Sequence, residues 1–179
     1  MKALAQVTPE RVIAEGFDTT TSVCLSHLGD NGYNIYLEIL GGGYGAGAHN
    51  DGCDGVDCPL SNCANIPLES VEMDYPFMRM ESYRLRTGTA GTGRHRGGLG
   101  LERAYRILAD GVQYATYCDR YRHGAQGLFG GGDGAPAESL IERGDEILRL
   151  TSKTGRQLKA GDRLVIRTGG GGGYGTTDE

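Results

Sequence analysis

Glycine-rich segments interrupt this chain along its whole length, and they constrain its fold more than any other feature. Glycine accounts for 32 of the 179 residues, about two and a half times its usual share, with 5 prolines and no collagen-like period. Such usage indicates many tight turns and close approaches between backbones. Long glycine-rich segments in a compact domain are usually packed against something, so we expect these to contact another subunit.

Short apolar runs between these segments favour β-strands. The predicted strands are Ser22–Leu28, Asn34–Leu40, Ser70–Arg86, Leu101–Leu108, Gln113–Arg120, Ser139–Arg143, Ile147–Ser152 and Arg163–Thr168. One short helical lead-in is expected, over Lys2–Gln6 and Pro9–Ala14, because Thr8 can cap it and Pro9 suits a first helical position. Strands and helices do not alternate, so we predict a single mostly β domain over 1–179, an antiparallel sandwich or barrel-like layers.

Charge and apolar content exclude some classes of partner. The net charge of −5 and pI near 5.4 argue against nucleic acid or an anionic membrane as the main partner. No run of about 18 apolar residues occurs, and Met1–Gln6 lacks the features of a signal peptide. Five cysteines, an odd number, fit reduced thiols. We therefore expect a cytoplasmic protein.

The segment Gly41–Gly47 follows an apolar run, which raises the possibility of a phosphate-binding loop. Such a loop needs a helix N-terminus after the glycines, and a P-loop also needs a Lys-Ser/Thr pair. Turn-forming residues follow instead, from His49 to Gly55. Tight packing of chains is therefore the favoured interpretation of this segment.

Several potential metal ligands crowd the next segment. The weak candidates for binding a metal are His49, Cys53, Cys58 and Cys63, with Asp51, Asp54 and Asp57 among them. Structural zinc sites usually have closer cysteine pairs and a second pair elsewhere, which is not obvious here. The alternative is a set of buried neutral thiols beside Asx-type turns.

Two groups of charged residues suggest further sites. Glu69, Glu72 and Asp74 alternate with apolar residues, which on a strand would place the carboxylates on one face, either as an acid/base pair or as a solvated surface. Arg94 and Arg96 lie among glycines within Thr87–Gly100. Their guanidinium groups and the exposed amides suit a carboxylate or phosphate ester, or the arginines pair with acidic neighbours in a hairpin loop.

Taken together, the glycine motifs resemble those of a known family. In chain order they are Gly41-Gly-Gly-Tyr-Gly, Asp51-Gly-Cys-Asp-Gly, Ser61-Asn-Cys-Ala-Asn-Ile-Pro-Leu-Glu69, Tyr75-Pro76, Gly91-Thr-Gly-Arg-His-Arg-Gly-Gly-Leu-Gly100, Gly127-Leu-Phe-Gly-Gly131 and Gly169–Gly175. This combination resembles the C-terminal part of the hydantoinase B/oxoprolinase family, which includes N-methylhydantoinase, 5-oxoprolinase, caprolactamase, and acetone and acetophenone carboxylases. B-type subunits are several times longer, so the chain looks like a C-terminal fragment or a split subunit.

The resemblance implies hydrolysis of a cyclic amide C–N bond by an ATP-dependent complex. Carboxylation of a ketone within a similar complex is one alternative, and a non-enzymatic binding or scaffold module is another. The expected partners are a hydantoinase A-type subunit and an N-terminal B-type chain, which would hold ATP/Mg and a divalent metal, while this chain alone binds no cofactor. The residues expected to face substrate or partner are Asp51, Asp54, Asn62, Asn65, Glu69, Arg94 and Arg96.

Overall fold

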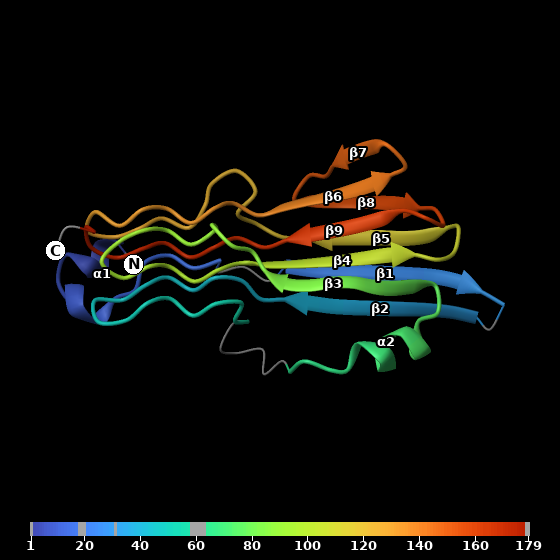
Figure 1. The fold of residues 1–179 in the computed structure, drawn as a ribbon, viewed down its shortest axis with the longest axis horizontal. Coiled ribbons are helices and arrows are strands. Elements are labelled where there is room, and N and C mark those ends of the chain that lie inside the picture. The colour runs from blue at the N-terminus through green and yellow to red at the C-terminus, as the bar shows by residue number, and fades with distance from the viewer. Residues whose placement is uncertain (1, 18–20, 31, 58–63, 178–179) are drawn as a thin grey trace.

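Two antiparallel sheets form one half of the molecule (Figure 1). The computed structural model describes residues 2–17, 21–30, 32–57 and 64–177. The first sheet has the order β2-β1-β5-β8 and is formed by β1 (Thr21–Gly29), β2 (Gly32–Leu40), β5 (Val112–Tyr117) and β8 (Lys153–Leu158). The second has the order β3-β4-β9-β6-β7 and is formed by β3 (Met78–Leu85), β4 (Leu101–Ile107), β6 (Glu138–Arg143), β7 (Glu146–Arg149) and β9 (Arg163–Arg167).

The sheets pack face to face around one core, as in a sandwich. Leu25 and Tyr114 from the first sheet and Tyr105, Leu164 and Ile166 from the second are all buried within it. The predicted mostly β fold with antiparallel layers is confirmed in its sandwich form, with no closed barrel. None of the helices in the described residues is long and apolar enough to cross a membrane.

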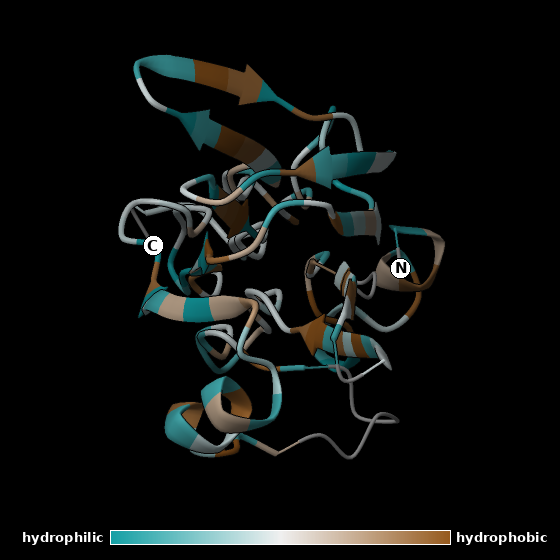
Figure 2. Cartoon of the chain, turned by 90° about the vertical axis from the view of Figure 1, so that its right-hand side faces the viewer, coloured by the Kyte–Doolittle hydropathy of each residue, from teal (hydrophilic) through white to brown (hydrophobic). Residues whose placement is uncertain are grey.

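The predicted strand Ser70–Arg86 is wrong in its first part. Leu68–Asp74 forms helix α2, which lies at one edge of the sheets, far from the β6–β7 hairpin (Figure 2). Leu68, Val71 and Tyr75 contact the core at the i, i+3, i+7 spacing of a helix, and this period decides the structure. Glu69 and Asp74 are consequently exposed on a helix instead of sharing one face of a strand.

The helical lead-in is shorter than predicted. Helix α1 covers Lys2–Ala5, and a 3-10 helix (η1) covers Pro9–Arg11. Residues 12–17 are extended, because the amide of Ala14 donates to the carbonyl of Ala46 at 2.8 Å in place of a helical partner. Strand β8 was not predicted, since its sequence Lys-Thr-Gly-Arg-Gln-Leu buries only Leu158.

The other half of the molecule is built from extended segments that run side by side (Figure 1). We call this half the glycine region; it comprises residues 12–17, 42–54, 89–100, 124–137 and 168–175, which are joined by backbone hydrogen bonds. The segment 168–175 lies at its centre and bonds to all four others. Gly171 donates to Gly98 at 2.9 Å, Gly172 to Glu15 at 2.8 Å, Gly173 to Gly132 at 2.9 Å, and Gly43 donates to Gly169 at 3.0 Å.

The glycines of this central segment are required by space. A β-carbon at Gly171 would lie 1.9 Å from the carbonyl oxygen of Tyr44, and one at Gly170 would lie 1.9 Å from that of Thr89. Only glycine fits where backbones approach this closely, as at the axis of the collagen triple helix. These glycines contact their own chain, so the expectation that the segments pack against another subunit is wrong for them. Tight packing of Gly41–Gly47 is confirmed, because a β-carbon at Gly43 would meet Gly98 at 2.0 Å.

Candidate functional site

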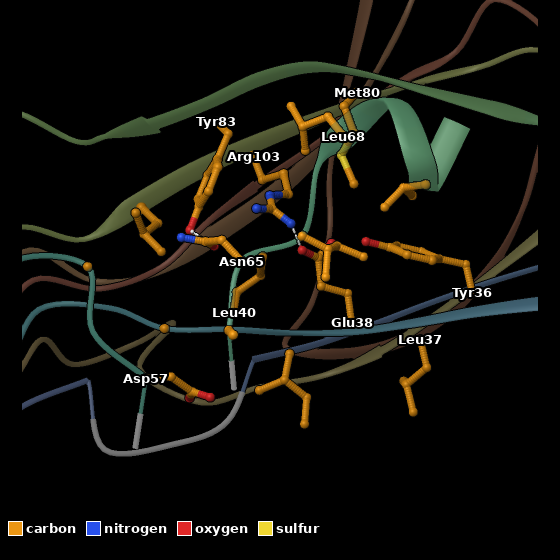
Figure 3. A pocket seen from close by; sticks show the side chains of 17 residues that line it. Tyr36, Leu37, Glu38, Leu40, Asp57, Asn65, Leu68, Met80, Tyr83 and Arg103 are labelled. Atoms are coloured by element: carbon orange, nitrogen blue, oxygen red, sulfur yellow. Dashed lines mark hydrogen bonds and ion pairs between the residues drawn. The ribbon is translucent and has the colours of Figure 1, made fainter. Parts of the chain in front are cut away.

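A pocket of about 300 Å³ opens at the edge of the sandwich, where β2 faces β3 and β4 (Figure 3). Strand alternation points Tyr36 and Glu38 of β2 towards Arg103 of β4. Helix α2 adds Leu68 and Val71 to its wall. Residues 64–66 form a further part of its described wall. The site therefore depends on both sheets and on the helix that was predicted as a strand.

A buried ion pair lies in this pocket. Glu38 and Arg103 contact each other with side chains that are 11% and 7% exposed, and the hydroxyl of Tyr105 donates to Glu38. The guanidinium carbon of Arg103 lies 3.8 Å from the centroid of the Tyr83 ring, a cation–π arrangement. The hydroxyl of Tyr83 in turn donates to Oδ1 of Asn65 at 3.0 Å. A chain of contacts thus links β2, β4, β3 and the 64–66 segment.

One donor of the pocket has no partner among the described atoms. The Nε of Arg103 is buried and lacks a hydrogen-bond acceptor among the described atoms. An unpaired buried N–H is costly, and a ligand oxygen could accept from it. Glu38 balances the positive charge of Arg103, so the pocket suits a small neutral molecule with an acceptor oxygen and an apolar body.

The buried phenols at the pocket, Tyr36 and Tyr105, offer little for acid–base chemistry. Burial raises the pKa of Tyr36 to about 12 and the pKa of Tyr105 well above its ordinary value, so both phenols stay protonated at neutral pH. Neither histidine nor cysteine is among the described residues that line the pocket. The arrangement is suited to binding and orienting a molecule.

Three of the residues predicted from sequence, Asp51, Asp54 and Arg96, lie together at a second place, in the glycine region. The guanidinium of Arg96 forms a fork with the carboxylate of Asp54, at 2.7 and 3.1 Å. Asp54 also accepts the amide of Leu99 at 2.8 Å, and Asp51 accepts the amide of Arg96 at 3.0 Å. The hydrogen bond from Arg96 holds the pKa of Asp54 below its ordinary value. The pairing of Arg96 with an acidic neighbour is therefore confirmed.

The other predicted site residues are dispersed. Arg94 is exposed and donates to the carbonyl of Ala48 at 3.2 Å. Asn65 borders the pocket, and Glu69 is exposed on α2. Asn62 lies outside the described residues. Whether these residues face substrate or partner stays a prediction.

The metal hypothesis finds no support in the part of the chain that is described. There, no three or more side chains of His, Cys, Asp or Glu form a group that could hold a metal ion. Cys58 and Cys63 lie outside the described residues. His49 and Cys53 are exposed, so the alternative of a buried thiol is wrong for Cys53.

Sequence reasoning missed Glu38, Arg103 and Tyr105. A signal for them was present, because an acid and a base each interrupt an apolar strand, and such residues are rarely buried unless paired. Their mutual distance depends on how the two sheets face each other, which no local pattern reports.

Comparison with known proteins identifies the family of this chain. The profile of the hydantoinase B/oxoprolinase family matches residues 1–177. The chain belongs to the hydantoinase B/oxoprolinase family. It is 35% identical over 178 residues to a protein from Pseudomonas sp. (strain NS671) that is named as the B-type subunit of a D-/L-hydantoinase, covering 98% of this chain and 30% of that protein. It is 35% identical over 156 residues to 5-oxoprolinase 1 of Arabidopsis thaliana, covering 86% of this chain and 12% of that one.

Solved structures have the same fold as this family member. An ATP-dependent caprolactamase from Pseudomonas jessenii superposes with a TM-score of 0.81 at 23% identity, over 98% of this chain and 32% of that one. An acetone carboxylase in a nucleotide-free structure superposes with a TM-score of 0.71 at 17% identity, over 97% and 28%. The chain thus spans about a third of the length of these proteins or less.

Proposed function

We propose that this chain is the C-terminal part of a B-type subunit in an ATP-dependent complex that hydrolyses the C–N bond of a cyclic amide. The family match over residues 1–177 carries the proposal. Hydrolysis is favoured over carboxylation because the relatives similar in sequence are named for a hydantoinase and a 5-oxoprolinase. The acetone carboxylase is similar only in fold.

In this proposal the partner chains are a hydantoinase A-type subunit and an N-terminal B-type chain, and they hold ATP/Mg and a divalent metal. The present chain contributes a rigid body, in which the glycine region fixes the positions of Asp51, Asp54, Arg94 and Arg96. The free thiols of Cys24, Cys53 and Cys118 agree with assembly in the cytoplasm.

Reconstitution tests the proposal. The A-type subunit, the N-terminal B-type chain and this chain are combined, and ATP consumption is followed with hydantoins, 5-oxoproline, lactams and ketones, with and without bicarbonate. We expect turnover of a cyclic amide that needs all three chains and does not need bicarbonate. Turnover of a ketone that needs bicarbonate would favour carboxylation, and turnover by this chain alone would contradict the proposal. Association without turnover of any of these substrates would favour a scaffold.

A further inference from the structure

The outer face of the first sheet is unusually apolar. Strand alternation points Tyr36, Glu38 and Leu40 of β2 inward, and the alternate positions point outward. Leu37 accordingly lies on the opposite side of β2 from Glu38, where it also borders the rim of the pocket (Figure 3). We define the apolar face by the outward-pointing residues of β1, β2 and β5 that are large, apolar and exposed: Leu28, Tyr33, Ile35, Leu37, Ile39 and Tyr117.

These side chains are extensively exposed. Leu37 is 65% exposed and Ile35 is 52% exposed, on a strand at the edge of its sheet. An antiparallel sheet that faces water on one side normally presents polar residues there. No charged side chain occupies an outward position on β1, β2 or β5, where the remaining residues are Ser22, Cys24, Ser26, Gln113 and Ala115. A contiguous apolar surface of this kind is typical of an interface.

Two hydroxyl groups on the apolar face, those of Tyr33 and Ser22, already donate hydrogen bonds within it. The hydroxyl of Tyr33 donates to Oγ of Ser26 at 2.9 Å. Oγ of Ser22 donates to the carbonyl of Tyr117 at 3.2 Å. Covering this face would therefore remove few hydrogen bonds to water, and desolvation would cost little.

The outer surface of the second sheet, on the opposite side of the sandwich, carries charged residues that are suited to contact with water. There Arg167 bridges Glu102 and Glu138 at 2.7 Å each, and Arg163 bridges Glu81 at 2.9 Å and Glu142 at 3.0 Å. On the same surface Ala104, Leu140 and Val165 form a small apolar cluster whose members are at most 5% exposed. The outer surface of the second sheet thus carries ion pairs, whereas the outward positions of β1, β2 and β5 carry no charged residue.

We propose that the apolar face is the docking surface for the remainder of the B-type polypeptide, whether that remainder is joined to this chain or is a separate subunit. The proposal rests on the proposed function for the nature of the partner. The chain spans only 30% of the D-/L-hydantoinase subunit and 32% of the caprolactamase chain, so each of those proteins has more than twice as much additional polypeptide. The nearest charge on the same sheet face is Lys153 of β8, which lies opposite Tyr117. Because β1, β2 and β5 carry no outward charge, the apolar face requires a partner surface that is mainly apolar, and long-range steering by charge contributes little.

The test uses two matched exposed aliphatic residues on strands of opposite sheets. Leu37→Arg places a charge on the apolar face, and Ile147→Arg places one on β7, where Ile147 is 62% exposed. The probe is the N-terminal B-type chain of the same organism, and binding is measured by isothermal titration calorimetry. We expect Leu37→Arg to weaken binding by about tenfold or more, and Ile147→Arg to leave it unchanged. Thermal unfolding of both variants should match the wild type, since surface substitutions seldom change stability.

Three outcomes would overturn the proposal. These are no binding of the N-terminal chain by the wild type, equal binding by wild type and Leu37→Arg, or sedimentation showing a wild-type dimer that Leu37→Arg dissociates, which would assign the face to a second copy. Should the reconstituted complex fail to hydrolyse any cyclic amide while Leu37→Arg still prevents binding, the proposed function is wrong and the docking surface stands.

Discussion

A β-carbon at Gly97 would lie 1.9 Å from the carbonyl oxygen of Gly171. The two residues are far apart in sequence, and their segments are joined by the hydrogen bond from Gly171 to Gly98. The glycine region is thus held together by backbones in direct contact, a form of packing in which no side chain can move aside.

Alanine at these positions should therefore disrupt the fold. We expect Gly97→Ala and Gly171→Ala each to lower the free energy of unfolding by about 3 kcal/mol or more, measured by urea denaturation. Gly155→Ala is the matched control, because a β-carbon there would find its nearest neighbour, the carbonyl oxygen of Tyr114, at 3.8 Å. Equal stability of Gly171→Ala and Gly155→Ala would refute the proposed role of direct backbone contact.

Stability should decline in acid through the carboxylates of the second sheet. Burial acts to raise the pKa of Glu102, but hydrogen bonds and charges from Arg167 and Arg84 outweigh it and hold the pKa below its ordinary value. A pKa lower in the folded than in the unfolded chain adds stability above the unfolded value, and this stability is lost as the pH falls through the folded value. The free energy of unfolding should therefore fall below about pH 5. Glu102→Gln should flatten this dependence, and Glu10→Gln should not.

The pair Glu38 and Arg103 should behave as a coupled unit. Glu38→Gln and Arg103→Met each leave a buried charge without its partner, so we expect each to destabilise the fold by about 3–5 kcal/mol. The loss of stability in the double variant should be about 1–3 kcal/mol smaller than the sum of the losses in the two single variants. A double-mutant cycle on the exposed pair Lys153 and Asp119, whose charged atoms lie 3.2 Å apart, is the control. We expect its coupling energy to be below about 1 kcal/mol. Additive effects of Glu38→Gln and Arg103→Met would contradict a functional pair in the pocket.

Alanine substitutions of Arg94 and Arg96 should have different effects on the stability of this chain and on the activity of the assembled complex. Arg96 is held by Asp54, so Arg96→Ala should lower the thermal midpoint of this chain and Asp54→Ala should do the same. Arg94 is exposed and donates a side-chain hydrogen bond to the carbonyl of Ala48, so Arg94→Ala should lower the midpoint less than Arg96→Ala. If Arg94 faces the substrate, this variant should reduce kcat/KM of the complex by about tenfold or more, the size expected for loss of one charged hydrogen bond. Wild-type kcat/KM in Arg94→Ala would remove Arg94 from the substrate site.

Local patterns predicted most strands and failed where structure depends on distant segments. The runs around Ser22–Leu28 and Asn34–Leu40 became β1 and β2, and the hairpin between them followed from its turn residues. Helix α2 was missed because the alternation of acids over Glu69–Asp74 masked a helical spacing of apolar residues. In β2 the face with more apolar residues points away from the core, so hydrophobicity alone would favour the wrong side.

The candidate site was the least predictable feature. Arg96 and Asp54 could be proposed as site residues from the sequence around them. The two hydrogen bonds that join their side chains could not be predicted in this way. The pocket around Arg103 required knowledge of which strands face each other. Gly41–Gly47 was recognised as close packing, whereas the long glycine segments were expected to contact another subunit, and only the arrangement in space identified their partners within the chain.

The central position of segment 168–175 has a consequence for biosynthesis. During translation this segment leaves the ribosome after all the segments that it joins, so residues 12–17, 42–54, 89–100 and 124–137 each lack one or more hydrogen-bond partners until it emerges. The two sheets lack only β9 until shortly before that moment. The nascent chain therefore exposes unpaired backbone until its final glycines arrive, and this interval is when a chaperone would be most useful.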